Sequence, residues 1–414
     1  VTLGNARTAL FNWPFARHMN GTFVLRVEDT DKERSRIEFE TGRGGIIETL
    51  HWLGLDPDEG PEQGGTYGPY RQSERLDLYE KYLRQLLEQG SAYYCFCAKE
   101  ELELDRQAML AQGIPPKYSG RCRSMQRDEA EKRIQKGESA VIRFKIPEVK
   151  IEFTDMIRGK VKFDGSLLGD VVIAKSIREP LYNFAVTIDD HLMQITHVIR
   201  GEDHISNTPK QICMQKALKL NDVQYAHLPL LLAPDRSKLS KRHIETSIAD
   251  YKEQGYLPEA LVNFLALLGW HPKDDTEILN REELIKEFDL KRVQKAGAVF
   301  NIEKLAWMNA QYIKHMSVDE LMGYLSLFIP RSWQKDNLLL KKAVQLEQER
   351  LRVLTDFKKT DDLENYFLQF AKDFGCSELT QKSEYKDKII LDDEYYENKI
   401  MPIMTDFEEL ATYE

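Results

Sequence analysis

A short basic loop carries the residues with the clearest capacity for chemistry. The loop covers 237–243 and reads SKLSKRH, which places Lys238 and Lys241 on either side of Ser240. Two mobile ammonium groups beside a hydroxyl can surround a polyphosphate and stabilise the negative charge that grows on it during phosphate chemistry. The same residues also fit a solvated basic turn, so the spacing alone leaves both interpretations open.

Three other stretches could complete a site beside this loop. Residues 3–12 (LGNARTALFN) combine a glycine turn with a helical pattern, and residues 197–204 (HVIRGEDH) bring an arginine and two carboxylates together. Residues 26–31 (RVEDTD) gather carboxylates at the end of a predicted strand, although a solvated acidic turn explains that cluster better when it is taken alone. The glycine turn, the apolar segment before the loop and the loop itself together favour ATP handling.

Apolar patterning predicts the elements that position these residues. Alternation over 23–27 predicts a half-buried strand, and helical spacing over 5–18 predicts a helix that Pro14 should kink or end. Continuous apolar runs predict buried strands over 184–188, 192–199 and 227–232. Further helices are predicted over 46–53, 76–87, 257–268, 281–288, 317–328 and 336–356.

The pattern changes twice along the chain. Residues 91–180 mix a charged helix, a glycine–proline turn and short strands, which predicts an inserted α+β subdomain, and no strand is predicted after residue 246. The expected fold class is therefore α/β, with a Rossmann-type parallel sheet that is interrupted by an α+β insertion and followed by an all-helical C-terminal part.

Composition narrows the class of protein. The 414 residues are 42% apolar and 30% charged, which is typical of a soluble chain with several domains. The net charge of −10 argues against a generally basic nucleic-acid coat but permits a local basic face. Five cysteines give no disulfide framework, and no stretch of eighteen apolar residues or basic leader is found. A cytoplasmic, monomeric enzyme with no membrane partner is expected.

The basic loop, residues 3–12 and residues 197–204 together resemble the glutamyl-tRNA synthetases, class I enzymes with HIGH and KMSKS signatures, over nearly the whole chain. The resemblance implies a catalytic Rossmann core, an acceptor-stem insertion, a helical stem-contact region and an incomplete anticodon-binding region. Their expected boundaries are 1–90 with 181–245, then 91–180, 246–310 and 311–414. The implied partners are L-glutamate, ATP with Mg²⁺ and tRNA(Glu), with tRNA(Gln) as a second candidate.

The resemblance also assigns roles to residues. Lys241, Lys238 and Ser240 would be catalytic, and the ATP site would comprise Gly4, Asn5, Lys238, Leu239, Ser240, Lys241 and Arg242. Glu28 would meet the amino group of glutamate and Arg200 its side-chain carboxylate, because a bidentate arginine is the physical means of selecting an acid. Tyr182, Asn183 and Asp203 would complete the substrate pocket.

Two elements of the inserted segment are implied by the same resemblance. Cys95, Cys97, Tyr118 and Cys122 resemble the zinc element of some members, although a tyrosine is an uncommon fourth ligand and three half-buried thiols without metal are the alternative. tRNA contact is expected from a basic run with interleaved acids. The run contains Arg121, Arg123, Arg127, Lys132, Arg133 and Lys136.

The chain departs from the family pattern near its beginning. Thr2 stands where the family has the histidine of its HIGH motif, and no strand precedes it. A second arginine of the family's pocket would lie before Val1, so a sequence truncated at both ends is expected. The alternatives are a catalytically impaired remnant that binds tRNA or ATP and a tRNA-base-modifying relative, which the long helical tail disfavours. Glutamine-specific relatives are also close, but LSKRH with HVIRGEDH favours glutamate.

Overall fold

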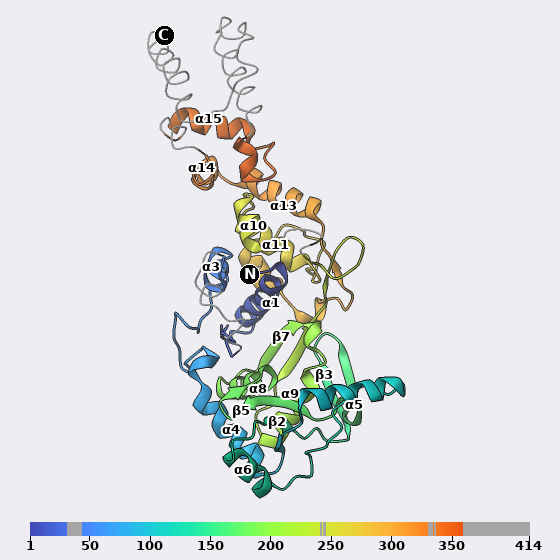
Figure 1. Cartoon of the computed structure of the whole chain (residues 1–414). Coiled ribbons are helices and arrows are strands. Elements are labelled where there is room, and N and C mark those ends of the chain that lie inside the picture. Colours follow the sequence, from blue (N-terminus) through green and yellow to red (C-terminus); the bar gives the residue numbers. More distant parts are fainter. Residues whose placement is uncertain (31–43, 241, 243–245, 330–333, 335–336, 359–414) are drawn as a thin grey trace, which may run out of the picture. The chain divides into compact units, whose positions relative to one another are not determined.

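The computed structural model describes residues 1–30, 44–240, 242, 246–329, 334 and 337–358 (Figure 1). The chain divides into two compact units. The first contains Val1–Ser240 and Ala266–Phe300, and the second contains Lys241–Leu265 and Asn301–Glu414. Within the described ranges, no helix is both long enough and apolar enough to cross a membrane.

The sheet that carries the candidate site has the strand order β4-β3-β8-β7. Strands β7 (His197–Gly201) and β8 (Gln224–Leu228) are parallel, and β8 pairs with β3 (Lys150–Asp155), also in parallel, through Asp155 and Tyr225. Strand β4 (Gly159–Asp164) closes one edge in antiparallel pairing with β3. Because β7 and β8 point the same way, the residues that follow them meet at one edge of the sheet.

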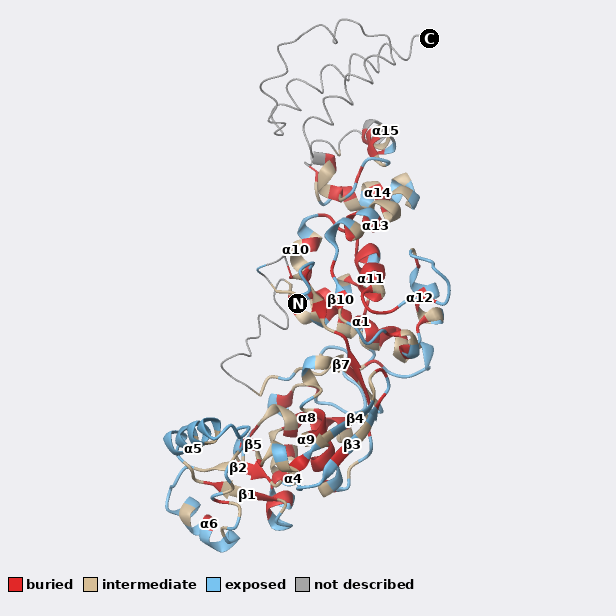
Figure 2. Cartoon of the chain, turned by 90° about the vertical axis from the view of Figure 1, so that its right-hand side faces the viewer, coloured by how far each residue is buried: buried red, intermediate tan, exposed pale blue. Residues whose placement is uncertain are grey.

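The helices of this unit bury apolar side chains against the two sheets. Helices α4 (Leu76–Glu88), α8 (Tyr182–Leu192) and α9 (Thr208–Leu218) contribute to one continuous apolar core with the strands. Figure 2 shows the buried residues of α8 and α9 between more exposed segments. Helix α8 is buried at every position from Phe184 to Asp190, so it is a core helix and not a surface helix.

Most of the inserted segment forms a second, antiparallel sheet. Its strand order is β1 (Ala92–Cys95), β2 (Val141–Phe144), β5 (Val171–Ser176) and β6 (Glu179–Pro180). Helices α5 (Lys99–Ala111), α6 (Arg127–Gln135) and α7 (Gly165–Leu168) belong to the same stretch, and α5 has no buried residue (Figure 2). The segment is not wholly separate from the first sheet, because its β3–β4 hairpin extends that sheet.

The remaining elements of the first unit include helix α1 (Leu3–His18). Helix α1 packs on β7 and on α12 (Arg281–Glu287), and Phe11 meets Phe288 edge to face with ring centroids 5.4 Å apart. The short elements of this region are α3 (Ile46–Trp52), η1 (Gln72–Glu74), η2 (Glu202–His204), β9 (Leu231–Leu232), η3 (Leu290–Arg292) and β10 (Ala298–Val299). Strand β9 pairs in parallel with β10.

The described part of the second unit is helical. It contains α10 (Ile248–Glu253), most of α11 (Pro258–Leu267), α13 (Ile302–His315), α14 (Val318–Leu325), α15 (Asn337–Glu347) and η5 (Leu354–Lys358). Asn309 is fully buried at its centre and accepts from the Leu257 amide at 2.8 Å, while its own amide donates to the Arg352 carbonyl at 2.7 Å. This pairing satisfies backbone groups inside an apolar core.

The expected fold class is confirmed, but several predicted elements are wrong. The run 184–188 is helical, because a short, fully buried apolar run looks the same in a helix and in a strand. Residues 23–27 form only isolated bridges, Val24 to Glu59 and Val27 to Arg71. Helix α1 continues through Pro14 to His18, β7 begins only at His197, and the two-residue strand β10 lies beyond residue 246.

Candidate active site

Arg200 is the centre of the candidate amino-acid pocket. It lies near the end of β7 and is half-buried. Its Nη2 donates to Thr208 Oγ1 at 2.8 Å and to Gln211 Oε1 at 2.9 Å, and its Nε donates to His227 Nε2 at 3.2 Å. Three hydrogen bonds to groups on α9 and β8 fix the plane of the guanidinium, which leaves Nη1 as the nitrogen that none of them uses.

Tyr182 and Asn183 lie beside Arg200 at the start of α8. The Tyr182 hydroxyl is 3.1 Å from His204 Nδ1, and Asn183 Oδ1 accepts from Gln211 Nε2 at 3.0 Å. Burial, with a smaller contribution from the negative charge of Glu28, raises the pKa of Tyr182 to about 12. The phenol therefore stays protonated and can donate a hydrogen bond at neutral pH.

Glu28 joins the pocket through a network of charged side chains. Arg26 Nη2 donates to Glu28 Oε1 at 3.1 Å, and Arg26 Nη1 donates to Asp190 Oδ1 at 2.9 Å. The side chain of Glu28 is 36% exposed, and its partial desolvation, opposed by the charge of Arg26, raises its pKa. Burial likewise raises the pKa of Asp190 despite the same arginine. One arginine thus fixes two carboxylates on one side of the pocket.

Asp189 supports this network from the core. Its side chain is completely buried and accepts from Arg75 Nε at 2.7 Å, from the Tyr79 hydroxyl at 2.7 Å and from Gln72 Nε2 at 2.9 Å. Arg75 is itself only 2% exposed. Three donors satisfy the hydrogen-bonding capacity of this buried carboxylate, and such a network holds its side chains in a single conformation.

The basic loop is held by its backbone and by side-chain contacts, which include the hydrogen bond of Ser237 Oγ to Asp235 Oδ1 at 2.6 Å. Leu239 donates its amide to the Leu231 carbonyl and Ala233 donates to the Ser237 carbonyl, both at 2.9 Å, with Arg236 at a positive φ of 64° in the turn. The Lys238 ammonium is 3.8 Å from Asp203 Oδ2, and both side chains are more than half exposed. The loop is therefore anchored to the segment that follows β7.

His204 lies close enough to Arg200 and Lys238 to feel the charge of both. Burial lowers its pKa first, and the positive charges of Arg200 and Lys238 lower it further, while Asp203 opposes them. The imidazole is accordingly neutral at physiological pH. The structure thus brings Arg200, Tyr182, Asp203 and Lys238 into one neighbourhood.

The remaining residues of the predicted ATP site are distributed differently. Leu239 and Ser240 are half-buried, and Arg242 is exposed and belongs to the second unit. Lys241 lies outside the residues that the structure describes. Gly4 and Asn5 occupy the first turn of α1, where the Asn5 amide donates to Thr2 Oγ1 at 3.2 Å.

The first turn of α1 is compatible with an anion. It contains no acidic side chain, and the start of a helix favours negative charge. A Cβ atom on Gly4 would approach only Thr2 Oγ1, at 3.9 Å, so the space around this glycine is not filled by the rest of the described protein. These features fit the phosphates of ATP.

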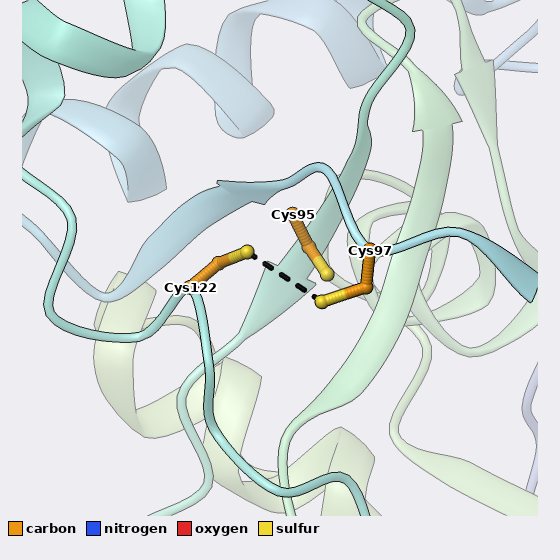
Figure 3. Close-up of side chains that lie close together, drawn as sticks. All are labelled: Cys95, Cys97 and Cys122. Atoms are coloured by element: carbon orange, nitrogen blue, oxygen red, sulfur yellow. Dashed lines mark hydrogen bonds between the residues drawn. The ribbon is translucent and has the colours of Figure 1, made fainter. Parts of the chain in front are cut away.

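The three cysteines of the inserted segment converge (Figure 3), and Tyr118 lies against two of them. The sulfur atoms of Cys95, Cys97 and Cys122 lie within 4.8 Å of one another, and the Cys97–Cys122 separation is 3.7 Å. The Tyr118 hydroxyl is 3.3 Å from the Cys95 sulfur and 3.5 Å from that of Cys97. Zn–S bonds of about 2.3 Å in a tetrahedron separate the sulfurs by about 3.8 Å, so the Cys97–Cys122 separation matches zinc ligation and the cluster could hold the metal.

The basic run of the inserted segment is largely neutralised by nearby acids. Arg121 pairs with Asp105, and Arg123 pairs with the buried Asp170. Arg127 pairs with Glu131 at 2.6 Å and Arg133 with Glu138 at 2.5 Å. The pairs of Arg121, Arg127 and Arg133 are at least partly exposed and exchange partners at little cost, so these three arginines remain available to phosphates. The buried Asp170 holds Arg123 more firmly.

Comparison with known proteins agrees with this geometry. Residues 2–307 match the family of class I tRNA synthetases for glutamate and glutamine (E and Q), catalytic domain, so the chain belongs to the class I tRNA synthetases. It is 48% identical to a glutamate–tRNA ligase of Natranaerobius thermophilus over 86% of this chain and 74% of the relative, and 47% identical to one of Caldicellulosiruptor saccharolyticus over 96% and 82%. Within that class the chain is a member of the glutamate–tRNA ligase family.

A solved structure supports the same assignment. The glutamate–tRNA ligase from Elizabethkingia meningosepticum in complex with its amino acid superposes with a TM-score of 0.79 at 35% identity, covering 92% of this chain and 81% of that one. The resemblance inferred from the sequence motifs is therefore confirmed for family and fold. The roles assigned to individual residues remain predictions.

The sequence did not reveal the residues whose hydrogen bonds and ion pairs position the predicted site residues. Arg26, Asp189 and His227 were visible in the sequence but carried no assigned role, and Asp155 lies in a segment that was predicted only as part of the insertion. The adjacent pair at 189–190 was the available signal, since two carboxylates at the end of a buried apolar run need cationic partners. The apolar run before them predicted a strand, but Asp189 and Asp190 lie on helix α8.

Proposed function

We propose that this chain activates L-glutamate with ATP and transfers the glutamyl group to the 3′-terminal adenosine of tRNA(Glu). The observation that carries the proposal is the convergence of Arg200, Tyr182 and Glu28. A fixed guanidinium selects a carboxylate by charge and by paired hydrogen bonds, whereas a carboxylate nearby attracts the substrate ammonium. A ligand that carries both an ammonium group and a side-chain carboxylate, as glutamate does, would satisfy these groups together.

The chemical step that we propose is the activation of a carboxylate. A carboxylate oxygen of glutamate attacks the α-phosphorus of ATP, the bond to the β-phosphate oxygen breaks, and pyrophosphate leaves. Lys238 and Lys241, with Ser240, would stabilise the charge on the phosphates, and Mg²⁺ would accompany ATP. The ribose hydroxyl of the tRNA terminus then attacks the acyl carbon, and AMP leaves.

The rest of the ATP site follows the same proposal. Gly4 and Asn5 at the start of α1 would receive phosphate, and Leu239 and Arg242 would contribute from the loop. Support comes from the open space around Gly4 and from the absence of acidic residues in the first turn of α1. Asp203 would orient Lys238, since the two charged groups are 3.8 Å apart.

Each predicted segment of the chain would contact a different part of the tRNA. The segment 91–180 would contact the acceptor stem through its arginines, 246–310 the stem, and 311–414 the anticodon region. tRNA(Gln) is a second candidate partner, and a cytoplasmic monomer is the expected state. Support for tRNA binding comes from the exposed arginine–carboxylate pairs, which phosphates can displace.

The cysteine cluster is proposed as a structural zinc site. Cys95, Cys97 and Cys122 would supply thiolates and Tyr118 the fourth position. Zinc would add stability to a small segment whose helix α5 has no buried residue. Metal analysis of purified chain should give about one zinc per chain if the proposal holds, while Cys97→Ser should lose it and Cys213→Ser, a buried thiol outside the cluster, should retain it.

Glutamate-dependent charging of tRNA tests the main proposal. The chain should charge tRNA with glutamate and not with glutamine, and Arg200→Gln should lose this preference. Binding of tRNA and ATP without any charging would instead support the alternative of an impaired remnant. Charging with glutamine at the same efficiency would contradict the assignment of Arg200 as the selecting group.

A further inference from the structure

A buried histidine lies directly behind Arg200. His227 stands on β8, and its side chain is 0% exposed. Its Nε2 receives the hydrogen bond from Arg200 Nε at 3.2 Å and lies 3.0 Å from Thr208 Oγ1, while its Nδ1 is 2.6 Å from Asp155 Oδ2. Asp155 is also completely buried. The three side chains form one line from β3 through β8 to β7.

The hydrogen bonds specify which nitrogen of His227 carries the proton. Arginine Nε can only donate, so His227 Nε2 must accept and cannot carry hydrogen. The ring proton therefore resides on Nδ1 and is donated to Asp155 Oδ2. An imidazole with hydrogen on Nε2 would direct that hydrogen at the Nε–H of Arg200, which is an unfavourable arrangement of two donors.

Asp155 is itself held in one orientation. Its Oδ1 accepts from the backbone amides of Arg158 at 2.8 Å, Ile157 at 2.9 Å and His227 at 3.3 Å. Burial would oppose ionisation, but the hydrogen bond with His227 and the backbone amides outweigh it and lower the pKa of Asp155. Oδ2 is thus left for the imidazole.

We propose that His227, kept in a single tautomer by Asp155, is a positioning residue that sets the direction of Arg200 toward an acidic substrate side chain. This inference rests on the proposed function, because it assumes that Arg200 receives the carboxylate. The fixed acceptor at Nε2 orients the guanidinium plane so that Nη1 faces the ligand. Preorganisation of this kind increases affinity because the ligand does not have to order the arginine.

Asp155→Asn is the sharpest variant. The three backbone amides require an oxygen at the Oδ1 position, so the new amide nitrogen takes the place of Oδ2 and donates to His227 Nδ1. The imidazole must then carry its hydrogen on Nε2, facing the Arg200 donor. The same reversal of tautomer is the general consequence of replacing a buried aspartate behind a histidine by asparagine.

Two substitutions of His227 separate positioning from filling space. An asparagine amide reaches the Nδ1 position and keeps the contact with Asp155, but it leaves Arg200 Nε without an acceptor. A glutamine amide reaches the Nε2 position and can offer its oxygen to Arg200. The two side chains are similar in polarity, so a role limited to packing or stability would not rank them in this order.

The test is the affinity of the chain for L-glutamate, measured by calorimetry, with thermal unfolding as the check on folding. We expect Asp155→Asn and His227→Asn to weaken glutamate binding by about tenfold or more, and His227→Gln by no more than about threefold. Tyr93→Phe, which loses a buried hydrogen bond to Asp170 in the other sheet, serves as the control and should bind normally.

The outcomes distinguish a failure of this inference from a failure of the proposed function. Unchanged affinity in Asp155→Asn and His227→Asn, or equal losses in His227→Asn and His227→Gln, would overturn the positioning role. Arg200→Gln is measured alongside them. If that variant also binds glutamate as tightly as the unmodified chain, the assignment of Arg200 fails and the proposed function fails with it.

Discussion

Arg200 and Lys238 belong to one candidate site but are held in opposite ways. Arg200 makes three hydrogen bonds to protein groups between 2.8 and 3.2 Å, all of them to side chains that are fully or almost fully buried. Lys238 is 66% exposed and has one ion pair, at 3.8 Å, with a half-exposed carboxylate. The arginine is fixed before any ligand arrives, whereas the lysine can move.

The difference matches the chemistry that each residue would face. Selecting glutamate over a neutral side chain of the same length requires a cation in a fixed direction, because only geometry and charge tell the two apart. The phosphates of ATP change shape and charge during the reaction, and flexible point charges can follow them. We therefore expect changes in the fixed region to be large and independent of salt, and changes in the loop to be smaller and sensitive to salt.

The largest effect should follow from removing the support of the fixed region. Asp189→Ala removes the carboxylate partner of the buried Arg75, which keeps hydrogen bonds to neutral backbone carbonyls. We expect this change to lower the free energy of unfolding by about 3–5 kcal/mol, measured by denaturant titration. Asp77→Ala removes an exposed pair with Arg178 and should leave stability nearly unchanged. Equal stability of the two variants would contradict the view that the pocket is held by its buried network.

Arg200→Lys tests the fixed region through ligand binding. Lysine keeps the charge but loses the planar set of donors, so Thr208, Gln211 and His227 lose their fixed partner. We expect glutamate affinity to fall about a hundredfold, by calorimetry, with ATP affinity unchanged. The loss should be the same at low and high salt, since a half-buried contact is poorly screened. A loss of affinity that disappears at high salt would mean that Arg200 behaves like the exposed, screened charges of the loop.

Lys238→Ala tests the mobile region. Removing one exposed cation near the phosphates should weaken binding of ATP with Mg²⁺ by about tenfold at low salt, and the difference should shrink as ionic strength rises. Glutamate affinity should not change. Lys175→Ala, an exposed lysine on β5, is the matched control and should have no effect on either ligand. An effect on glutamate as large as that on ATP would remove the distinction between the two regions.

The sequence predicted the residues that would face the ligands better than the buried residues that position them. The basic loop could be found because charged residues after an apolar strand mark the ligand edge of a sheet, whereas the roles of Arg200 and Glu28 were implied by the family resemblance. The network behind them could not, since Asp189 and Arg75 are 114 positions apart and nothing local pairs them. Residues 184–188 were assigned to a strand because burial on all sides removes the periodicity that separates a helix from a strand.

The same limit applies to the line from Asp155 to Arg200. Asp155 lies in the segment predicted as an insertion, and only the pairing of β3 with β8 brings it to His227. A register between parallel strands that are far apart in sequence depends on tertiary packing. The composition of the inserted segment predicted strands there but gave no reason for one of them to extend the core sheet.

Glu28 combines features of the two regions, and its effect should be the smallest. It is partly exposed, yet tied to the buried network by Arg26. Its carboxylate must be ionised to attract the substrate ammonium, so affinity should fall as pH drops through its pKa. Because partial desolvation raises that pKa, the loss should begin at a higher pH than an ordinary glutamate would give.

Glu28→Gln separates the effect of protonating Glu28 from the effect of protonating other carboxylates of the pocket. We expect about fivefold weaker glutamate binding at neutral pH, and an affinity that then changes little until Asp190, whose pKa is also raised, takes up its proton. Calorimetric titrations between pH 4.5 and about 7.5 would measure both curves. Parallel curves for the variant and the unmodified chain would mean that Glu28 does not meet the ammonium and that its place in the pocket is structural, through Arg26.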